Sequence, residues 1–339
     1  MRILGCLLPN SSQKIRIFDA TREKNMKFLV SILLSAAIIP EVGTAHLPPT
    51  VILDEDFSTD VDDVLAVRMA TKADKLGYIN LACVGLSCSN YNASRAMHGL
   101  LSYDGYSDIP IGTCSEENVQ TNDYWGELWG YGDENTLIQY NSVELYKNVL
   151  SKSDTKVKIV TTGYLYNVAN LLKDKDGYEL VKTKCDSIWI TGGSWKSGMD
   201  NNFYAMPKSA EAIRYVINHS PVPLVFSTSN TMSIKEEYRC IMTGDTLNSS
   251  DPVAKALKKY GQVHNFNMEN GYYSWDNVCV FAACYPFEIN QMHLTPCNIY
   301  VAPNGANTFD LEGNFNCQVI ERNSNDLTWY EDVINSYMN

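Results

Sequence analysis

The sequence lacks the phosphate-binding and nucleophile motifs of several common enzyme classes. It contains neither a glycine-rich Walker loop nor a Gly-x-Ser-x-Gly elbow, so nothing in it predicts a P-loop enzyme or a serine hydrolase. None of its 10 cysteines is spaced Cys-x-x-Cys, and a structural zinc site is therefore not expected. It also has no internal repeat and no long low-complexity linker.

An excess of basic residues is missing as well. With 27 Lys and Arg against 39 Asp and Glu, the formal net charge is −12. The first 45 residues are themselves net basic, so the rest of the chain is more acidic still. A surface this acidic repels phosphate groups. Neither nucleic acid nor an anionic membrane is therefore expected as a partner.

The N-terminus has no hydrophobic run long enough to span a membrane, which takes about 20 residues. It has instead the pattern of a secretory signal peptide: a basic start at Met26, an apolar stretch from Phe28 to Ile39, and small residues up to Ala45. We expect a leader over residues 1–45 that begins functionally at Met26 and is cleaved after Ala45. The remainder, residues 46–339, is expected to form a single secreted domain.

Secretion would also determine whether the cysteines are thiols or form disulfide bonds. One of them, Cys6, lies in the leader, and an oxidising compartment would pair several of the others, with at least one left over because their number is odd. Glycosylation sequons begin at Asn92, Asn218 and Asn248, and they would be used only in a eukaryotic secretory pathway.

Short apolar runs alternate with amphipathic, helix-like stretches along most of the chain. The strand-like runs are Val51–Leu53, Ile79–Leu86, Ile109–Ile111, Val157–Val160, Ser187–Ile190 and Leu224–Phe226. The helix-like stretches are Val64–Lys75, Ala93–Tyr103, Val143–Ser151, Leu165–Lys173, Lys208–Asn218 and Pro252–Tyr260. This alternation predicts the α/β class, with a mostly parallel central sheet, helices on both faces, and ligands bound beyond the carboxyl ends of the strands. The C-terminal stretch shows no pattern from which its topology can be assigned.

The densest chemical feature lies where the first apolar run meets the first helix-like stretch. Between residues 54 and 63 the chain carries six carboxylates: Asp54, Glu55, Asp56, Asp60, Asp62 and Asp63. Two like charges about 4 Å apart near a surface repel by about 4 kcal/mol, so this cluster needs either full hydration or a hard cation such as Ca²⁺ or Mg²⁺. The alternative is a solvated acidic loop in which Asp62 or Asp63 caps the following helix.

This segment resembles the signature of the inosine–uridine preferring nucleoside hydrolases. Their Asp-x-Asp-x-Gly-x-Asp-Asp turn runs into a helix, and here it is longer, with Ser58 in place of the glycine. Three further stretches resemble that family in the same order. The first, Thr161–Asn167, is similar to its Thr-Gly-Pro-Leu-Thr-Asn loop. The second, Gly192-Gly193 with Asp200–Phe203 and Pro207, is similar to its Gly-Gly … Glu-Phe-Asn … Asp-Pro segment. The third, Ser274–Val278, is similar to its late Asp at a helix start. The resemblance implies a Rossmann-like nucleoside hydrolase fold.

The resemblance also implies a Ca²⁺ site and a ribose site that share one residue. The Ca²⁺ ligands would be Asp56, Asp63, the backbone carbonyl of Thr162, and Asp276. The ribose hydroxyls would be held by Asp62, Asn90, Asp200, Asn202 and Asp276. It assigns no role to Asp60, and it makes a homodimer the default assembly.

Hydrolysis of a ribonucleoside to free base and ribose fits such a site. The N-glycosidic bond breaks through an oxocarbenium-like state, and carboxylates near the sugar stabilise its positive charge. A cation lowers the pKa of a bound water, which can then act as the nucleophile once an adjacent carboxylate takes its proton. Asp56 is the expected general base.

The leaving base needs assistance as well. Part of the family has a His just before the late Asp as the acid, whereas this chain has Trp275 there. Trp275, Tyr272 and Tyr273 form an aromatic cluster that would stack on a purine and favour its protonation, and His264 is another candidate acid. The alternative for all four is an ordinary place in the core, in an interface or in the structural framework.

Two other functions compete with nucleoside hydrolysis. Asp54 follows an apolar strand and also resembles the nucleophile of haloacid-dehalogenase-type phosphatases, which use Mg²⁺. Their late Gly-Asp-x-x-x-Asp motif begins here at Gly244-Asp245, but Ser249 occupies its last position. The second alternative is an inactive secreted relative that binds nucleosides or sugars, and it rests on the departures from the family pattern at Ser58, Asp200 and Trp275.

Overall fold

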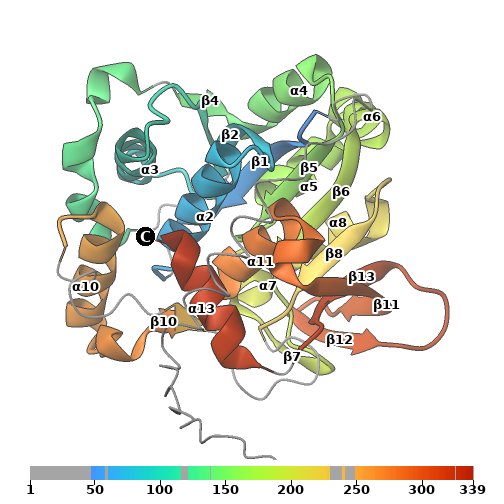
Figure 1. The fold of residues 1–339 in the computed structure, drawn as a ribbon. Coiled ribbons are helices and arrows are strands. Elements are labelled where there is room, and N and C mark those ends of the chain that lie inside the picture. The colour runs from blue at the N-terminus through green and yellow to red at the C-terminus, as the bar shows by residue number, and fades with distance from the viewer. Residues whose placement is uncertain are drawn as a thin grey trace, which may run out of the picture. The chain divides into compact units, whose positions relative to one another are not determined.

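An 11-stranded sheet runs through the unit formed by Pro48–Asn339 (Figure 1). The computed structural model describes residues 47–57, 60–115, 121–137, 139–229, 239–240, 249–324 and 326–338. The predicted leader, the sequon at Asn248 and the phosphatase-like Gly244-Asp245 lie outside these residues. Within them, no helix is both long and apolar enough to cross a bilayer.

Eight neighbouring strands of this sheet pair in parallel. In chain order they are β1 (Thr50–Glu55), β2 (Asn80–Leu86), β3 (Ile111–Thr113), β4 (Gln139–Asn141), β5 (Val157–Thr161), β6 (Cys185–Thr191), β8 (Leu224–Ser227) and β13 (Cys317–Arg322). Their spatial order is β4-β3-β2-β1-β5-β6-β8-β13, so the chain winds away from β1 in both directions. The predicted parallel sheet is confirmed, although β3 begins only at the last residue of the run Ile109–Ile111.

Successive residues of β1 face opposite sides of the sheet, as the pleat requires. Val51 and Leu53 belong to one hydrophobic cluster, Ile52 belongs to the other, and all three are fully buried. The first cluster includes residues of α2 (Asp63–Lys75), α3 (Tyr91–Tyr103), α10 (Pro252–His264), α11 (Trp275–Cys284) and α13 (Leu327–Met338). The second includes residues of α4 (Ser142–Lys152), α5 (Tyr166–Lys173), α6 (Lys175–Lys184) and α8 (Ser209–His219). Helices therefore cover both faces, as predicted (Figure 1).

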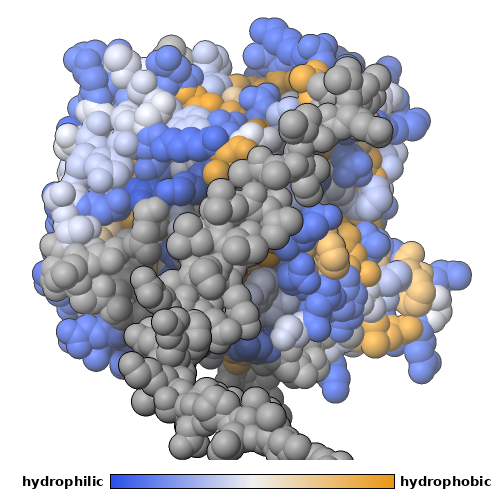
Figure 2. Space-filling view, viewed as in Figure 1, coloured by the Kyte–Doolittle hydropathy of each residue, from blue (hydrophilic) through white to orange (hydrophobic). Residues whose placement is uncertain are grey.

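The C-terminal stretch that the sequence pattern left unassigned adds antiparallel strands to the sheet. β11 (Met292–Val301) pairs with β13 on one side and with β12 (Ala306–Asp310) on the other, and β7 (Ser197–Met199) lies beyond β12. Apolar residues reach the surface near this edge (Figure 2), where Leu311 and Phe315 are exposed. The other described elements are α7 (Asn201–Tyr204), α12 (Phe287–Asn290), β9 (Arg239–Cys240), β10 (Tyr272–Tyr273) and the 3-10 helices Asp123–Glu127, Trp129–Tyr131, Glu134–Thr136 and Met268–Asn270.

Eight cysteines of the described residues are buried thiols. Two of them, Cys297 and Cys317, are direct partners across β11 and β13, and their sulfurs lie 3.4 Å apart. The expected pairing of several cysteines is thus not present among the residues that the structure describes, and these two sulfurs are close enough for one such bond.

Candidate active site

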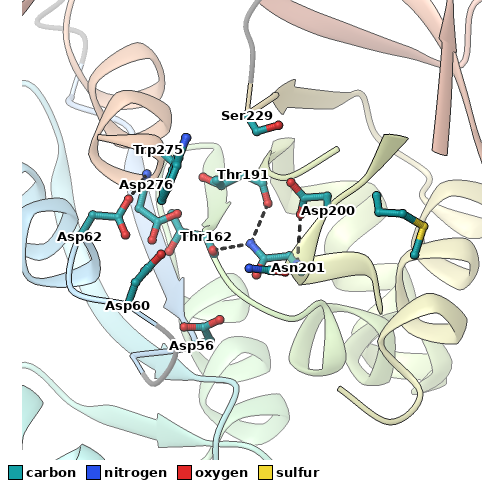
Figure 3. Close-up of a pocket in the computed structure, with 12 residues that line it drawn as sticks. Asp56, Asp60, Asp62, Thr162, Thr191, Asp200, Asn201, Ser229, Trp275 and Asp276 are labelled. Carbon is teal, nitrogen blue, oxygen red and sulfur yellow. Dashed lines mark hydrogen bonds between the residues drawn. The ribbon is translucent and has the colours of Figure 1, made fainter. Parts of the chain in front are cut away.

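A pocket of about 200 Å³ lies beyond the carboxyl ends of the parallel strands (Figure 3). It is lined by residues that follow or end β1, β5, β6 and β8, and by the first residues of α7 and α11. The lining residues are Asp56, Asp60, Asp62, Thr162, Thr191, Met199, Asp200, Asn201, Asn202, Ser229, Trp275 and Asp276. The pocket therefore stands where a sheet of this type is expected to bind its ligand.

The turn between β1 and α2 is closed by its own side chains and backbone. Phe57 has a positive φ of 52°, and its N–H donates to Asp63 Oδ1 at 3.0 Å. Its carbonyl accepts a hydrogen bond from Trp125 Nε1 at 2.8 Å, and its ring is fully buried against Tyr124. These contacts fold the acidic turn back over the end of β1, so that Asp62 and Asp63 approach the carboxylates at the strand end.

Two groups of carboxylates meet at Asp276. One consists of Glu55, Asp63 and Asp276, the other of Asp60, Asp62 and Asp276, and within each group one oxygen of every residue lies within 4.8 Å of the others. Apart from Asp60, these side chains are buried, with at most 6% of the residue exposed. A solvated acidic loop does not describe this arrangement. The side chain of Asp62 makes no capping hydrogen bond to α2 either.

The buried carboxylates fit a hard cation. Three of their oxygens, Glu55 Oε1, Asp62 Oδ1 and Asp63 Oδ2, receive no hydrogen bond from the described residues. Burial, followed by the neighbouring carboxylates, raises the pKa of Asp63 and Asp276 well above the usual range. A divalent cation among these oxygens would offset the repulsion and complete their coordination, and oxygen ligands select Ca²⁺ or Mg²⁺.

The structure brings two of the four predicted Ca²⁺ ligands into one carboxylate group, and the other two line the pocket. Asp63 and Asp276 belong to the same carboxylate group, whereas Asp56 lines the pocket but belongs to neither group. The backbone carbonyl of Thr162 accepts a hydrogen bond from Asn202 Nδ2 at 2.9 Å. Glu55 stands in the carboxylate group where the sequence predicted only aspartates.

The predicted ribose ligands line the pocket with one exception. Asp62, Asp200, Asn202 and Asp276 all border it (Figure 3). Asn90 is absent from the lining, and its side-chain oxygen instead accepts the N–H of Asn92 at 2.9 Å as the cap of α3. The structure thus places Asn90 at the start of α3, as its cap, and its place beside the sugar stays a prediction.

Asp200 and Asn202 form the wall opposite Asp62. Asp200 Oδ1 accepts the N–H of Asn202 at 3.0 Å, and Asn202 Nδ2 also donates to the carbonyl of Thr191 at 3.1 Å. Burial raises the pKa of Asp200 to about 6, and hydrogen bonds from two backbone N–H groups, which lower the pKa, limit this rise. Both side chains are therefore held in place by the backbone of the pocket itself.

Of the four residues predicted to assist the leaving base, the structure brings one to the pocket. Trp275 lines it and stacks on Tyr273, with ring centroids 4.7 Å apart and an interplanar angle of 18°. Tyr272 is buried, meets Trp275 edge-on and donates a hydrogen bond to Tyr260. His264 is exposed on α10, where it stacks on Tyr260. Tyr272, Tyr273 and His264 are not among the lining residues.

Asp54, the nucleophile on the phosphatase interpretation, is not a lining residue either. It is fully buried, accepts a hydrogen bond from the Tyr146 hydroxyl at 2.8 Å and a longer one from Asn167 Nδ2 at 3.4 Å. Burial raises its pKa to about 7. A nucleophile enclosed in this way cannot reach a phosphate in the pocket, so the structure does not support that interpretation.

Several lining residues were assigned no individual role from the sequence. Thr191, Asn201, Met199 and Ser229 belong to or follow strands β6, β7 and β8. The signal for Thr191 and Ser229 was present, because each ends or follows an apolar run that becomes polar. Asn201 lies within the family-like stretch Asp200–Phe203, whereas Met199 carries no such signal and depends on the path of the chain between β6 and α7.

Fold and pocket together define an α/β protein with a pocket for a small ligand beside buried carboxylates of the kind that hold a hard cation. The chain belongs to the inosine-uridine preferring nucleoside hydrolase family, whose model matches residues 51–329. The resemblance drawn from the four sequence stretches is thereby confirmed.

Two curated relatives share roughly a quarter of the aligned residues. The pyrimidine-specific ribonucleoside hydrolase RihA of Photobacterium profundum is 25% identical over 170 residues, which is 45% of this chain and 53% of the relative. The probable uridine nucleosidase 1 of Oryza sativa subsp. japonica is 22% identical over 175 residues, which is 47% of this chain and 53% of the relative. The chain thus spans about half the length of the curated relatives it matches.

Solved structures agree over a longer part of the chain. An inosine-guanosine nucleoside hydrolase (IG-NH) has a TM-score of 0.66 at 18% identity, covering 86% of this chain and 98% of that one. The type III effector protein XopQ, complexed with adenosine diphosphate ribose, has a TM-score of 0.64 at 14% identity, covering 91% and 96%. At these identities the likeness establishes the nucleoside hydrolase fold.

Proposed function

We propose that this protein hydrolyses the N-glycosidic bond of ribonucleosides and releases the free base and ribose. The observation that carries the proposal is the pocket, in which carboxylates and amides from separate segments converge in a chain of the nucleoside hydrolase family. The names of the two curated relatives, a ribonucleoside hydrolase and a uridine nucleosidase, support the same class of reaction.

The proposal includes Ca²⁺ as the cation, held by Asp56, Asp63, Asp276 and the backbone carbonyl of Thr162. When bound, the cation supplies Lewis acidity toward a water molecule and the ribose hydroxyls. In support, Asp63 and Asp276 belong to one buried carboxylate group, and Asp56 and Thr162 border the pocket beside it.

Three groups of residues supply the other steps: proton transfer, binding of the ribose hydroxyls and stabilisation of charge on the sugar. Asp56, in the pocket wall, takes the proton from the attacking water as general base. Asp62 and Asp276, joined by a hydrogen bond from Asp276 N to Asp62 Oδ2 at 3.0 Å, accept hydrogen bonds from the ribose hydroxyls. Asp200, across the pocket, adds negative charge beside the sugar as its oxocarbenium character develops.

Trp275 is proposed to assist departure of a purine base. Its indole is half-buried at the pocket, and Tyr273 stacks behind it and fixes the orientation of the ring. A base that stacks on this surface is held in a geometry that favours protonation of the purine ring. Tyr273 therefore acts through Trp275, and the proposal gives His264, which is not among the lining residues, no step.

Turnover of inosine, uridine, adenosine and guanosine by the purified protein tests the proposal. Asp56→Asn is expected to lower kcat by at least about 10²–10⁴-fold, the usual contribution of a general base. The matched control is Asp186→Asn, which removes an exposed carboxylate at the other end of β6 and should leave the rate unchanged. Binding of all four nucleosides without release of any base would contradict the proposal and would instead indicate a binding protein.

We also propose secretion, on the N-terminal pattern of a basic start, an apolar stretch and a small-residue cleavage site. N-terminal sequencing of protein recovered from a secreting host is expected to begin at His46. Recovery of the chain in the medium with residues 1–45 still attached would contradict cleavage.

A further inference from the structure

Glu55 is a buried acid that the proposed reaction does not use. It is the last residue of β1 and is fully buried. Because successive side chains of a strand point to opposite faces, it faces away from Asp54 on the same strand. One oxygen of its carboxylate lies within 4.8 Å of carboxylate oxygens of Asp63 and Asp276, so two of its close neighbours are acidic as well.

The two oxygens of Glu55 have different surroundings. Oε2 accepts a short hydrogen bond from the Thr162 hydroxyl, whose residue also supplies the backbone carbonyl expected at the cation. Oε1 is buried and receives no hydrogen bond from the described residues, and the same is true of Asp63 Oδ2. One oxygen is thus held by the Thr162 hydroxyl, while the other lies buried on the side of Asp63.

No positive group of the described residues is available to compensate this charge. The ion pairs formed among them involve other acids, such as Asp104 and Asp251 with Arg68, and none includes Glu55. A buried carboxylate of this kind is neutralised by a proton, by an ion-pair partner or by a metal ion. Of these, a cation offsets the charge of all three neighbouring carboxylates at once.

We infer that Glu55 is a direct ligand of the divalent cation, beside Asp63 and Asp276, and that the Thr162 hydroxyl orients it. The inference rests on the proposed function only in that the site holds a cation. Ca²⁺ takes six to eight oxygens and tolerates irregular geometry, so an additional carboxylate fits its coordination better than the near-ideal octahedron of Mg²⁺.

Cation binding without substrate tests this inference on the full chain. Glu55→Gln keeps the size of the side chain and an oxygen for Thr162, but it removes the charge. By calorimetry we expect Ca²⁺ affinity to fall by at least about 10- to 100-fold, which is the loss typical of outer-shell partners and a lower bound for a direct ligand. Asp54→Asn is the matched control, since this neighbouring residue is equally buried but points to Tyr146, and its Ca²⁺ affinity should stay within about twofold.

A second readout separates coordination from a structural role. With Tb³⁺ in the site, the luminescence lifetimes in H₂O and D₂O count the waters bound to the ion, and Glu55→Gln is expected to gain about one water as one ligand is lost. Unchanged Ca²⁺ affinity and unchanged hydration in a folded Glu55→Gln protein would overturn the inference while leaving nucleoside hydrolysis intact. Conversely, if Ca²⁺ affinity falls on this substitution but the wild type releases no base from any nucleoside, Glu55 remains a ligand and the proposed function fails.

Discussion

Asp62 Oδ2 accepts a hydrogen bond from the backbone N–H of Asp276 at 3.0 Å, across 214 positions of sequence. The contact ties the acidic turn after β1 to the first turn of α11. It explains how two carboxylates remain side by side in the pocket despite their repulsion, since the N-terminus of a helix favours negative charge. The two predicted ribose ligands are thus fixed by one bond.

Two substitutions of Asp62 separate its charge from this bond. Asp62→Asn keeps an oxygen that can accept the Asp276 N–H, whereas Asp62→Ala leaves that buried N–H unpaired. Both should abolish measurable turnover, but the alanine variant is expected to unfold with a free energy about 1 kcal/mol lower than the asparagine variant. Urea unfolding of both proteins measures the difference, and equal stabilities would contradict the importance of the bond.

Trp275 is expected to matter more for purines than for pyrimidines. Trp275→Ala removes the surface on which a base stacks, at a cost of about 1 kcal/mol or more in transition-state stabilisation, or about a fivefold loss of kcat/KM. The loss should be larger for inosine and guanosine than for uridine, and Trp275→Phe should restore part of it. Equal losses for the two classes of substrate would exclude Trp275 from assisting the leaving base.

Nucleosides are expected to be strongly preferred to nucleotides. The lining residues that the structure describes include Asp56, Asp60, Asp62, Asp200 and Asp276, and they include no Lys, Arg or His. Because placing like charges together costs several kcal/mol, kcat/KM for inosine 5′-monophosphate should be at least about 100-fold below that for inosine. Comparable values would show that a phosphate is recognised elsewhere.

Oxidation is expected to join Cys297 and Cys317. They are direct partners across β11 and β13, with sulfurs 3.4 Å apart, so two thiols can be converted to one disulfide with loss of two protons and two electrons to oxidised glutathione. Closing this loop should raise the free energy of unfolding by about 3 kcal/mol, and Cys297→Ala should abolish the gain. Peptide mapping by mass spectrometry identifies the bond. A protein that keeps both thiols under these conditions would contradict the prediction.

The parallel part of the fold was predictable from sequence because its signal is local. Runs such as Val51–Leu53 are buried on both faces and therefore read as continuous apolar segments between amphipathic helices. α6 and the strands β11 and β12 were not predicted. The burial of β11 varies irregularly along its length, so it shows no clean period of two, and its place depends on pairing with distant strands.

Site residues were predictable where several carboxylates cluster in the sequence. They were harder to predict where the same residue type also has a structural role, such as capping a helix. Asp62 and Asp63 were found because clustered carboxylates need a partner, whereas Asp276 was found through the resemblance of Ser274–Val278 to the family's late Asp. For Asn90 the sequence could not show that its side chain also caps the helix that follows, as it does in the structure. Glu55 was overlooked because alternation along β1 places it on the other face from its neighbours, and only the fold shows that α11 brings Asp276 to that face.

The most direct test of the account is release of free base and ribose from inosine before and after removal of divalent cations. We predict that a chelator abolishes release, that Ca²⁺ in excess of the chelator restores it, and that Asp276→Ala, still folded by circular dichroism, shows no activity in either condition. Hydrolysis that proceeds at the same rate in the chelator, or in the folded Asp276→Ala variant, would contradict a reaction built on this carboxylate-held cation.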